Sequence, residues 1–254
     1  MNEEQRINVC KTSVAQINNV LRTSPQQWRT YLNLARSVIA HLDATTLMQQ
    51  PSRATEQAWI IAALQRLAFA DPDNGEVEDI AVWCARQWQI LLQRDTQNVA
   101  ALRGMGEAWL ARAQPALSRI HRMDGSDSSG GSSQWSAPSI TSTEDERQNT
   151  AATTEAERRC GTADYVEARG FLQPAVEYLE RAVAAAPAQQ ALSGDLLVKT
   201  AEAYMSLGNA SSPRVNERYF RRALQLLRAG KAIPGYTLCL YLQRYLDDYG
   251  RLLE

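Results

Sequence analysis

Residues 175–187 read AVEYLERAVAAAP, and residues 197–208 read LVKTAEAYMSLG. In the first run Ala175 and Leu179 stand four residues apart, on one helical face, and Pro187 follows as a residue that cannot continue the helix. The second run mixes small and large apolar residues at the same spacing. Together the two runs predict a pair of short helices that pack through small residues, which is the unit of a helical repeat.

The rest of the chain also has the apolar period of helices rather than the alternation of strands. Ser24 and Pro25 are typical of a helix start, and the run Asp71–Gly75 is rich in turn-forming residues. We therefore expect an all-α fold. The expected helices in the first half of the chain cover about residues 9–21, 25–42, 52–70, 76–94 and 98–113.

Several of these helices resemble the tetratricopeptide (TPR) signature, W-x2-L-G-x2-Y followed by A-x3-F and a closing proline. In Leu102-x2-Met105-Gly106-x2-Trp109, the resemblance implies that Gly106 lets the partner helix approach. It covers roughly residues 55–230 and implies a TPR-like α-α solenoid of about three to four helix pairs, although Arg66 stands where an aromatic is expected. An unrelated helical bundle is the alternative. The other similar runs are Trp59 with Ala62 and Ala63, Cys84-x3-Trp88-x2-Leu91, and Leu197–Gly208 paired with Phe220-x2-Ala223.

Residues 123–156 form a low-complexity segment rich in glycine, serine, threonine and acidic residues, a composition that predicts a disordered loop. The first half of a repeat, Leu102–Trp109, precedes this segment, and the matching second half, Ala175–Pro187, follows it. We therefore expect an insertion inside one repeat and a single helical-repeat domain over residues 1–254.

Short motifs inside the segment have two readings. Ser133-Gln134 and the acidic run after Ser142 match minimal kinase sites, but serine-rich loops commonly contain such matches. Trp135 is placed to anchor the segment either on its own solenoid or on a partner. The sequence favours neither of these two anchoring sites for Trp135.

The charge balance bears on the class of partner. The chain has 27 basic and 28 acidic residues, so it lacks the positive field that nucleic acids or anionic membranes usually require. No apolar run approaches the roughly 20 residues of a membrane span, and the polar start, Met1–Lys11, has no apolar targeting core. We expect a cytoplasmic or nuclear protein with no membrane span, for which nucleic acid is an unlikely partner.

The sequence gives little sign of chemistry. It contains no nucleotide-binding glycine loop, no zinc-protease motif and no nucleophile elbow. The two histidines, His41 and His121, lie far apart, and the four cysteines have no metal-ligand spacing and are expected to be reduced and mostly buried. We therefore expect no catalytic residues, no metal site and no cofactor. An enzyme assembled from distant residues is the alternative from another class.

The resemblance also implies which residues contact a partner, because the first helix of each TPR repeat lines the ligand groove. Glu107 and Glu202 stand where a carboxylate-binding groove of the family has asparagine, so we expect the groove to hold an apolar or basic protein segment. The candidate groove residues are Arg103, Glu107, Leu110, Val198, Glu202 and Met205.

The last helical segment, Tyr236–Leu253, is a second candidate partner site. Tyr241, Tyr245 and Tyr249 recur every four residues beside a stripe of leucines, so the helix either docks on its own solenoid or receives a partner. Upstream, Arg214–Lys231 holds the main basic concentration, an alternative surface for a nucleic-acid-associated factor. As a whole, the sequence predicts a non-catalytic protein-binding scaffold or adaptor, a subunit of a larger intracellular complex.

Overall fold

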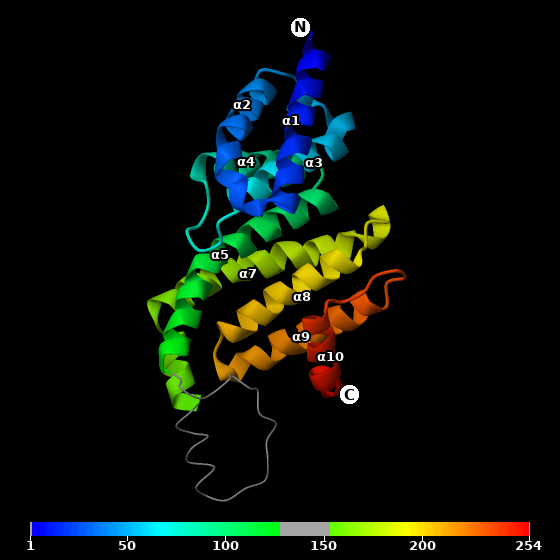
Figure 1. Cartoon of the computed structure of the whole chain (residues 1–254). Coiled ribbons are helices and arrows are strands. Elements are labelled where there is room, and N and C mark those ends of the chain that lie inside the picture. The colour runs from blue at the N-terminus through cyan, green and yellow to red at the C-terminus, as the bar shows by residue number, and fades with distance from the viewer. Residues whose placement is uncertain (1, 128–152, 254) are drawn as a thin grey trace, which may run out of the picture. The chain divides into compact units, whose positions relative to one another are not determined.

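The computed structural model describes residues 2–127 and 153–253 (Figure 1). Every regular element in these ranges is a helix, so the all-α prediction is confirmed for the described residues. The chain divides into two compact units. The first contains Met1–Arg112 and Glu177–Leu192, and the second contains Ala113–Val176 and Ser193–Glu254.

The first unit contains four complete α-helices. Parts of two more helices, α5 and α7, complete it, and short 3-10 helices (η) join them. The elements are α1 (Glu3–Thr23), η1 (Pro25–Tyr31), α2 (Leu32–Asp43), η2 (Leu47–Gln49), η3 (Pro51–Arg53), α3 (Ala54–Ala68), α4 (Glu78–Arg94), the start of α5 (Val99–Asp127), the end of α7 (Ala163–Ala185) and η4 (Pro187–Gln189).

The second unit takes the other parts of α5 and α7, and residues 153–160 between them are also helical. Its remaining elements are α8 (Gly194–Asn209), α9 (Pro213–Lys231), α10 (Leu240–Tyr249) and η5 (Gly250–Leu253). The segment 123–156, expected to be a loop, is therefore helical at both ends. Its middle part, 128–152, which includes Ser133, Trp135 and Ser142, lies outside the described residues.

Two helix boundaries differ from the sequence predictions. The prediction of an α-helix from Pro25 is wrong over η1, because the Ser24 side chain makes no capping hydrogen bond and a 3-10 turn instead packs Trp28 and Tyr31 against the core. The prediction that the fifth helix ends near Ala113 is also wrong. Helix α5 continues through Pro115. The proline removes one backbone hydrogen bond and clashes locally with the preceding turn, but it does not end the helix.

The core of the first unit joins α1, α2, α3, α4 and the start of α5 around fully buried aliphatic residues such as Leu42, Ile61 and Leu64. Trp88 of α4 lies directly against the backbone of Gly104 on α5, where an added Cβ would come within 2.3 Å of the indole. Gly104 thus permits a close approach of α4 to α5, while the expected close approach at Gly106 stays a prediction.

A buried polar side chain fixes this contact. The Trp88 Nε1–H donates to Gln65 Oε1 at 2.7 Å, and Gln65 Nε2 donates to the Gly104 carbonyl at 2.9 Å. Both side chains are almost completely buried, so each polar atom needs these partners. Helices α3, α4 and α5 are therefore locked in one register at this point.

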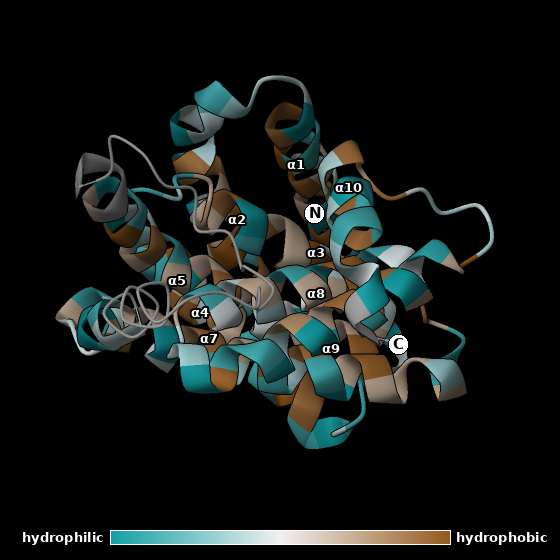
Figure 2. Ribbon diagram, turned by 90° about the horizontal axis from the view of Figure 1, so that it is seen from below, coloured by the Kyte–Doolittle hydropathy of each residue, from teal (hydrophilic) through white to brown (hydrophobic). Residues whose placement is uncertain are grey.

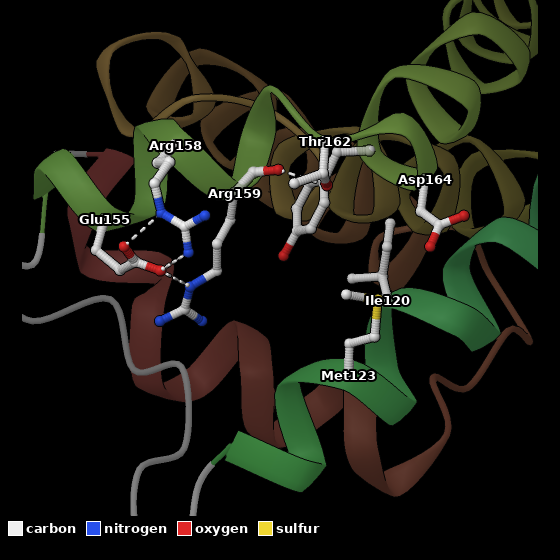
Figure 3. Close-up of a pocket in the computed structure, with 8 residues that line it drawn as sticks. Ile120, Met123, Glu155, Arg158, Arg159, Thr162 and Asp164 are labelled. Atoms are coloured by element: carbon white, nitrogen blue, oxygen red, sulfur yellow. Dashed lines mark hydrogen bonds and ion pairs between the residues drawn. The ribbon is translucent and has the colours of Figure 1, made fainter.

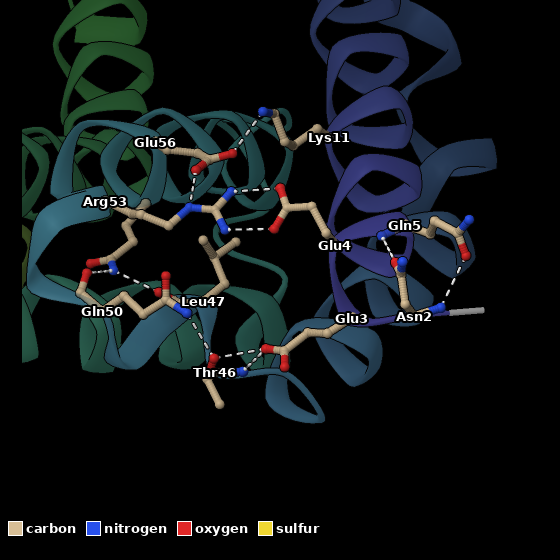
Figure 4. A network of polar contacts seen from close by, with 11 residues as sticks. Asn2, Glu3, Glu4, Gln5, Lys11, Thr46, Leu47, Gln50, Arg53 and Glu56 are labelled. Atoms are coloured by element: carbon tan, nitrogen blue, oxygen red, sulfur yellow. Dashed lines mark hydrogen bonds and ion pairs between the residues drawn. The ribbon is translucent and has the colours of Figure 1, made fainter.

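Charged side chains tie the connection between α2 and α3 to the start of α1 (Figure 4). Glu3 accepts hydrogen bonds from both the backbone N–H and the hydroxyl of Thr46 at 2.7 Å, and these bonds lower the pKa of its carboxyl. Arg53 donates to Glu4 and to Glu56, and Lys11 forms an ion pair with Glu56 at 2.7 Å. This network has a structural role, because each charge in it is satisfied within the unit.

In the second unit α8 and α9 lie side by side and antiparallel (Figure 1). An added Cβ at Gly208, near the end of α8, would come within 2.8 Å of the Phe220 ring on α9, whereas Gly230 at the other end of α9 lies near Leu197. The predicted pairing of Leu197–Gly208 with the Phe220 region is confirmed. Hydrophobic and hydrophilic segments both occur along α9 (Figure 2). Its leucines Leu224, Leu226 and Leu227 are buried.

Hydrogen bonds and ion pairs within each unit indicate that α5 and α7 run antiparallel. In the first unit, Gln189 Nε2 donates to the Gln97 carbonyl at 2.7 Å, next to the start of α5 and the end of α7. In the second unit, Arg119 of α5 forms ion pairs with Asp164 and Glu167 near the start of α7 at 2.7 and 2.6 Å. The ends of α5 and α7 are thus linked within each unit, and the expected pairing of Leu102–Trp109 with Ala175–Pro187 stays a prediction.

Candidate protein-binding surface

Helix α10 is held in the second unit by its leucines. Leu242 and Leu246, one turn apart, are 3% and 7% exposed, and Leu238 just before the helix is also buried. Arg228 of α9 donates from Nη2 to the Gly250 carbonyl at 3.0 Å, which satisfies a backbone acceptor at the end of α10. The helix is therefore docked on α9 along one face and at its C-terminal end.

The three predicted tyrosines of α10 fall into two environments. Tyr245 and Tyr249 are half-buried, and their ring centroids lie 5.0 Å apart at an interplanar angle of 50°. Burial raises the pKa of Tyr245 to about 12, and Tyr241 and Tyr249 add to the shift. Tyr241, in contrast, is 66% exposed. Tyr245 and Tyr249 therefore pack within the unit, whereas Tyr241 lies on the surface.

Leu240 stands beside Tyr241 and is also 66% exposed. Leu240 was not among the residues predicted to contact a partner, although the sequence holds a signal for it. Leu238, Leu242 and Leu246 follow helical spacing, and Leu240 falls between them on another face. Adjacent large apolar side chains that are exposed to water are typical of a surface that becomes buried when a partner binds. We define the exposed face of α10 as Leu240, Tyr241 and Arg244.

The predicted groove residues of α5 lie in the first unit. Arg103 Nε and Glu107 Oε1 form an ion pair at 2.7 Å, and both side chains are about one-third exposed. Leu110 is only 8% exposed, so the expectation that it is a surface contact does not hold. Arg103 and Glu107 remain on the surface, but their charges pair with each other.

The predicted groove residues of α8 lie in the second unit. Val198 and Met205 are buried, which contradicts their expected exposure; Glu202 forms an ion pair with Lys199 at 2.7 Å. The physical reason at Val198 is packing against α9, since a Cβ added at Gly230 would lie 3.6 Å from the Val198 Cγ2. Val198 and Met205 are consequently core residues of the second unit.

Most of the basic residues between Arg214 and Lys231 have partners within the second unit. Arg214 pairs with Glu157, and Arg221 pairs with Glu217 at 2.8 Å. The Arg218 guanidinium lies over the Tyr219 ring, 4.6 Å from its centroid. Because these arginines already have partners, the Arg214–Lys231 surface has fewer charges available to bind phosphates than the sequence indicated.

A small pocket in the second unit lies between the end of α5 and the start of α7 (Figure 3). Glu155 accepts hydrogen bonds from Arg158 at 2.8 and 2.7 Å and from Arg159 at 3.2 Å, which lower the pKa of the carboxyl to about 2. The volume of about 110 Å³ is below the roughly 300–1,000 Å³ of typical ligand sites. The pocket therefore has room for solvent or for one small side chain. Its lining residues are Ile120, Met123, Glu155, Arg158, Arg159, Thr162, Asp164 and Tyr165.

Over residues 2–127 and 153–253, no group of three or more histidine, cysteine, aspartate or glutamate side chains is arranged to hold a metal ion. Cys10 and Cys84 are buried thiols, and burial raises the pKa of each, whereas Cys239 is exposed, contrary to expectation. None of the described helices combines the length and apolar character that a membrane crossing requires.

No family model matches the chain, and neither a curated protein nor a solved structure is significantly similar to it. The site is therefore interpreted from its own residues.

Proposed function

We infer that the chain is a non-catalytic protein-binding scaffold or adaptor, a subunit of a larger assembly, and that its partner contacts the exposed face of α10. One observation carries this proposal. Leu240 and Tyr241 are both 66% exposed on a helix whose other large apolar residues are docked. Aromatic side chains are frequent anchors of protein interfaces, since they bury a large area at a small entropic cost.

The helix arrangement supports a TPR-like solenoid for the second unit. Helices α8 and α9 pack along each other at Gly208 and Gly230, and Arg169 of α7 donates to the Ala210 carbonyl just after α8. Stacked helix pairs present long surfaces to protein partners. The exposed apolar pair Leu240 and Tyr241 on α10 is expected of a surface that a partner covers.

The test is whether a partner depends on Tyr241. Tagged full-length chain and its Tyr241→Ala variant are used to purify interacting proteins from cell extract, and the candidate partner is then purified and titrated against both. We expect Tyr241→Ala to weaken binding by about 2 kcal/mol, close to thirtyfold, with an unchanged melting temperature.

Val82→Ala is the matched control, because Val82 is an exposed apolar residue of α4 in the first unit. It should leave the affinity unchanged. Equal affinities for wild type and Tyr241→Ala would remove α10 from the proposed site.

A further inference from the structure

Charges of both signs follow the apolar pair on the outer side of α10. Arg244 stands three residues after Tyr241, and Asp247 and Asp248 stand three and four residues after Arg244. Positions three and four apart are neighbours on a helix surface, so these side chains continue the exposed face of α10 toward its C-terminal end. All of them are exposed. The outer strip of α10 is thus made of Leu240, Tyr241, Arg244, Asp247 and Asp248.

The charges of the outer strip do not cancel one another within the chain. Neither Arg244 nor Asp248 forms an ion pair with a described residue, although they stand four positions apart on one helix. Asp247 accepts a hydrogen bond from Gln243 at 2.6 Å, a neutral donor that leaves its negative charge in place. Both signs of charge are therefore available to a partner.

The order of these charges decides which partner fits. A nucleic acid or an acidic protein segment matches Arg244 but is repelled by the two aspartates that follow it. A purely basic segment matches the aspartates and is repelled by Arg244. The outer strip fits a surface that has negative charge opposite Arg244 and positive charge opposite Asp247 and Asp248.

The same strip of a second copy is such a surface when the two helices run antiparallel. A twofold axis perpendicular to α10 reverses the direction of the second helix, so Arg244 of each copy faces Asp247 and Asp248 of the other. Two equivalent sets of ion pairs result. A parallel arrangement places arginine beside arginine and aspartate beside aspartate, which is repulsive.

We propose that the outer strip of α10 binds the same strip of a second copy of this chain, with the two helices antiparallel about a twofold axis. This inference rests on the proposed function and names the partner of the exposed face of α10. The ion pairs fix the direction and register of the two helices, and the apolar pair supplies buried area at each end of the contact.

The register also assigns a contact to the apolar pair. When Arg244 lies opposite the midpoint of the two aspartates, the twofold axis passes near Leu246, and Tyr241 then lies opposite Gly250 and Arg251 of the second copy. Arg251 is exposed and forms no ion pair with a described residue. Its guanidinium stacks on the Tyr241 ring of the other copy, because arginine over an aromatic face is a favourable pairing.

The size of the strip sets the strength of the dimer. From Leu240 to Arg251 the contact is about 17 Å long and one helix wide. This is well below the roughly 800 Å² per partner of a standard interface, so we expect a reversible dimer with a Kd on the order of 10 µM.

The first measurement is sedimentation equilibrium of the full-length chain at concentrations below and above that Kd. A reducing agent is present, because Cys239 next to the strip is exposed and would otherwise allow a disulfide between copies. We expect the average mass to rise from 28.3 kDa toward twice that value. Tyr241→Ala and Arg244→Glu should each weaken the dimer at least about tenfold. A mass that stays at the monomer value throughout, or a dimer that both variants retain, overturns the proposal.

The decisive measurement mixes two variants with complementary charges. Arg244→Glu makes every charge of the outer strip negative, and the double variant Asp247→Lys/Asp248→Lys makes every charge positive. Each variant alone should be monomeric over the same concentrations, whereas an equimolar mixture should form a dimer at least as tight as wild type. Circular dichroism of each variant checks that it is folded. A mixture of folded variants that stays monomeric overturns the antiparallel pairing.

Arg6→Glu is the matched control, because Arg6 is an exposed helical arginine of α1 with no ion pair among the described residues. It should dimerise like wild type, and a loss equal to that of Arg244→Glu would show that only net charge matters and overturn the proposal. A monomeric chain that still captures a different protein through Tyr241 overturns the proposal and leaves the proposed function standing. If neither a dimer nor a captured protein depends on Tyr241, both fail.

Discussion

Gly104→Ala tests the contact that holds α3, α4 and α5 in register. The added methyl carbon would lie 2.3 Å from Cε2 and 2.6 Å from Cζ2 of Trp88. Carbon atoms normally approach to about 3.5–4.0 Å, so one of the two helices or the indole must move by roughly 1 Å or more. The indole is poorly able to move, because it is 1% exposed and its N–H donates to Gln65.

The magnitude follows from two opposing effects. Overpacking a well-filled core costs about 1–3 kcal/mol, and a contact this short belongs at the upper end. Replacing glycine by alanine inside a helix contributes about 1 kcal/mol in the other direction, through lower backbone entropy in the unfolded chain. We therefore expect Gly104→Ala to lower the free energy of unfolding by about 2 kcal/mol.

Urea denaturation followed by circular dichroism measures this change, and Gly170→Ala is the matched control. Gly170 also lies inside a helix, α7, but an added Cβ there meets no atom within 4 Å. The control should stabilise the protein by up to about 1 kcal/mol, because only the entropic effect remains.

A double variant isolates the steric cause. Trp88→Phe removes the ring atoms nearest to Gly104, so adding Gly104→Ala to it should cost at least about 1 kcal/mol less than adding it to wild type. If Gly104→Ala and Gly170→Ala change stability equally, the proposed packing of α4 on α5 is incorrect.

Three further predictions concern the second unit. Gly208→Ala should destabilise by about 1–2 kcal/mol, because its Cβ would come within 2.8 Å of Phe220, and urea denaturation beside Gly170→Ala checks this. Tyr245 should titrate at about pH 12 in the folded protein; because its pKa is raised from the ordinary 10.0, stability present below pH 10 should be lost as the pH rises toward 12. Ultraviolet absorbance at high pH should show this step, and Tyr245→Phe should lack it. The lowered pKa of Glu155 stabilises the folded state above its ordinary 4.5 and loses this effect as the pH falls toward about 2, so Glu155→Gln should unfold with a weaker pH dependence over that range in acid denaturation.

The sequence predicted the helices well, because their apolar period is a local property. It also predicted the pairing of α8 with α9, since Gly208 and Phe220 are a small and a large residue at matching positions of a repeat. It did not indicate the close contact at Gly104, because that contact depends on where Trp88 of another helix lies.

The candidate site was predictable only in part, because burial depends on neighbours that a single helix does not specify. Val198 and Met205 were expected in an exposed groove, but both are buried, and Val198 packs near Gly230 of α9. The tyrosine stripe indicated α10 as a candidate partner site. Only the docking of Leu242 and Leu246 reveals that Tyr241 is its exposed member and that Leu240 accompanies it.

The division of the chain has a practical consequence for dissecting the protein. Neither unit is a continuous stretch of sequence, because Glu177–Leu192 belongs with Met1–Arg112 and is flanked by segments of the other unit. A fragment that ends at Arg112 would lack Tyr178, which packs on the core, and Gln189, which accepts a hydrogen bond from the backbone of Val99. Simple truncation therefore removes part of whichever unit it aims to retain.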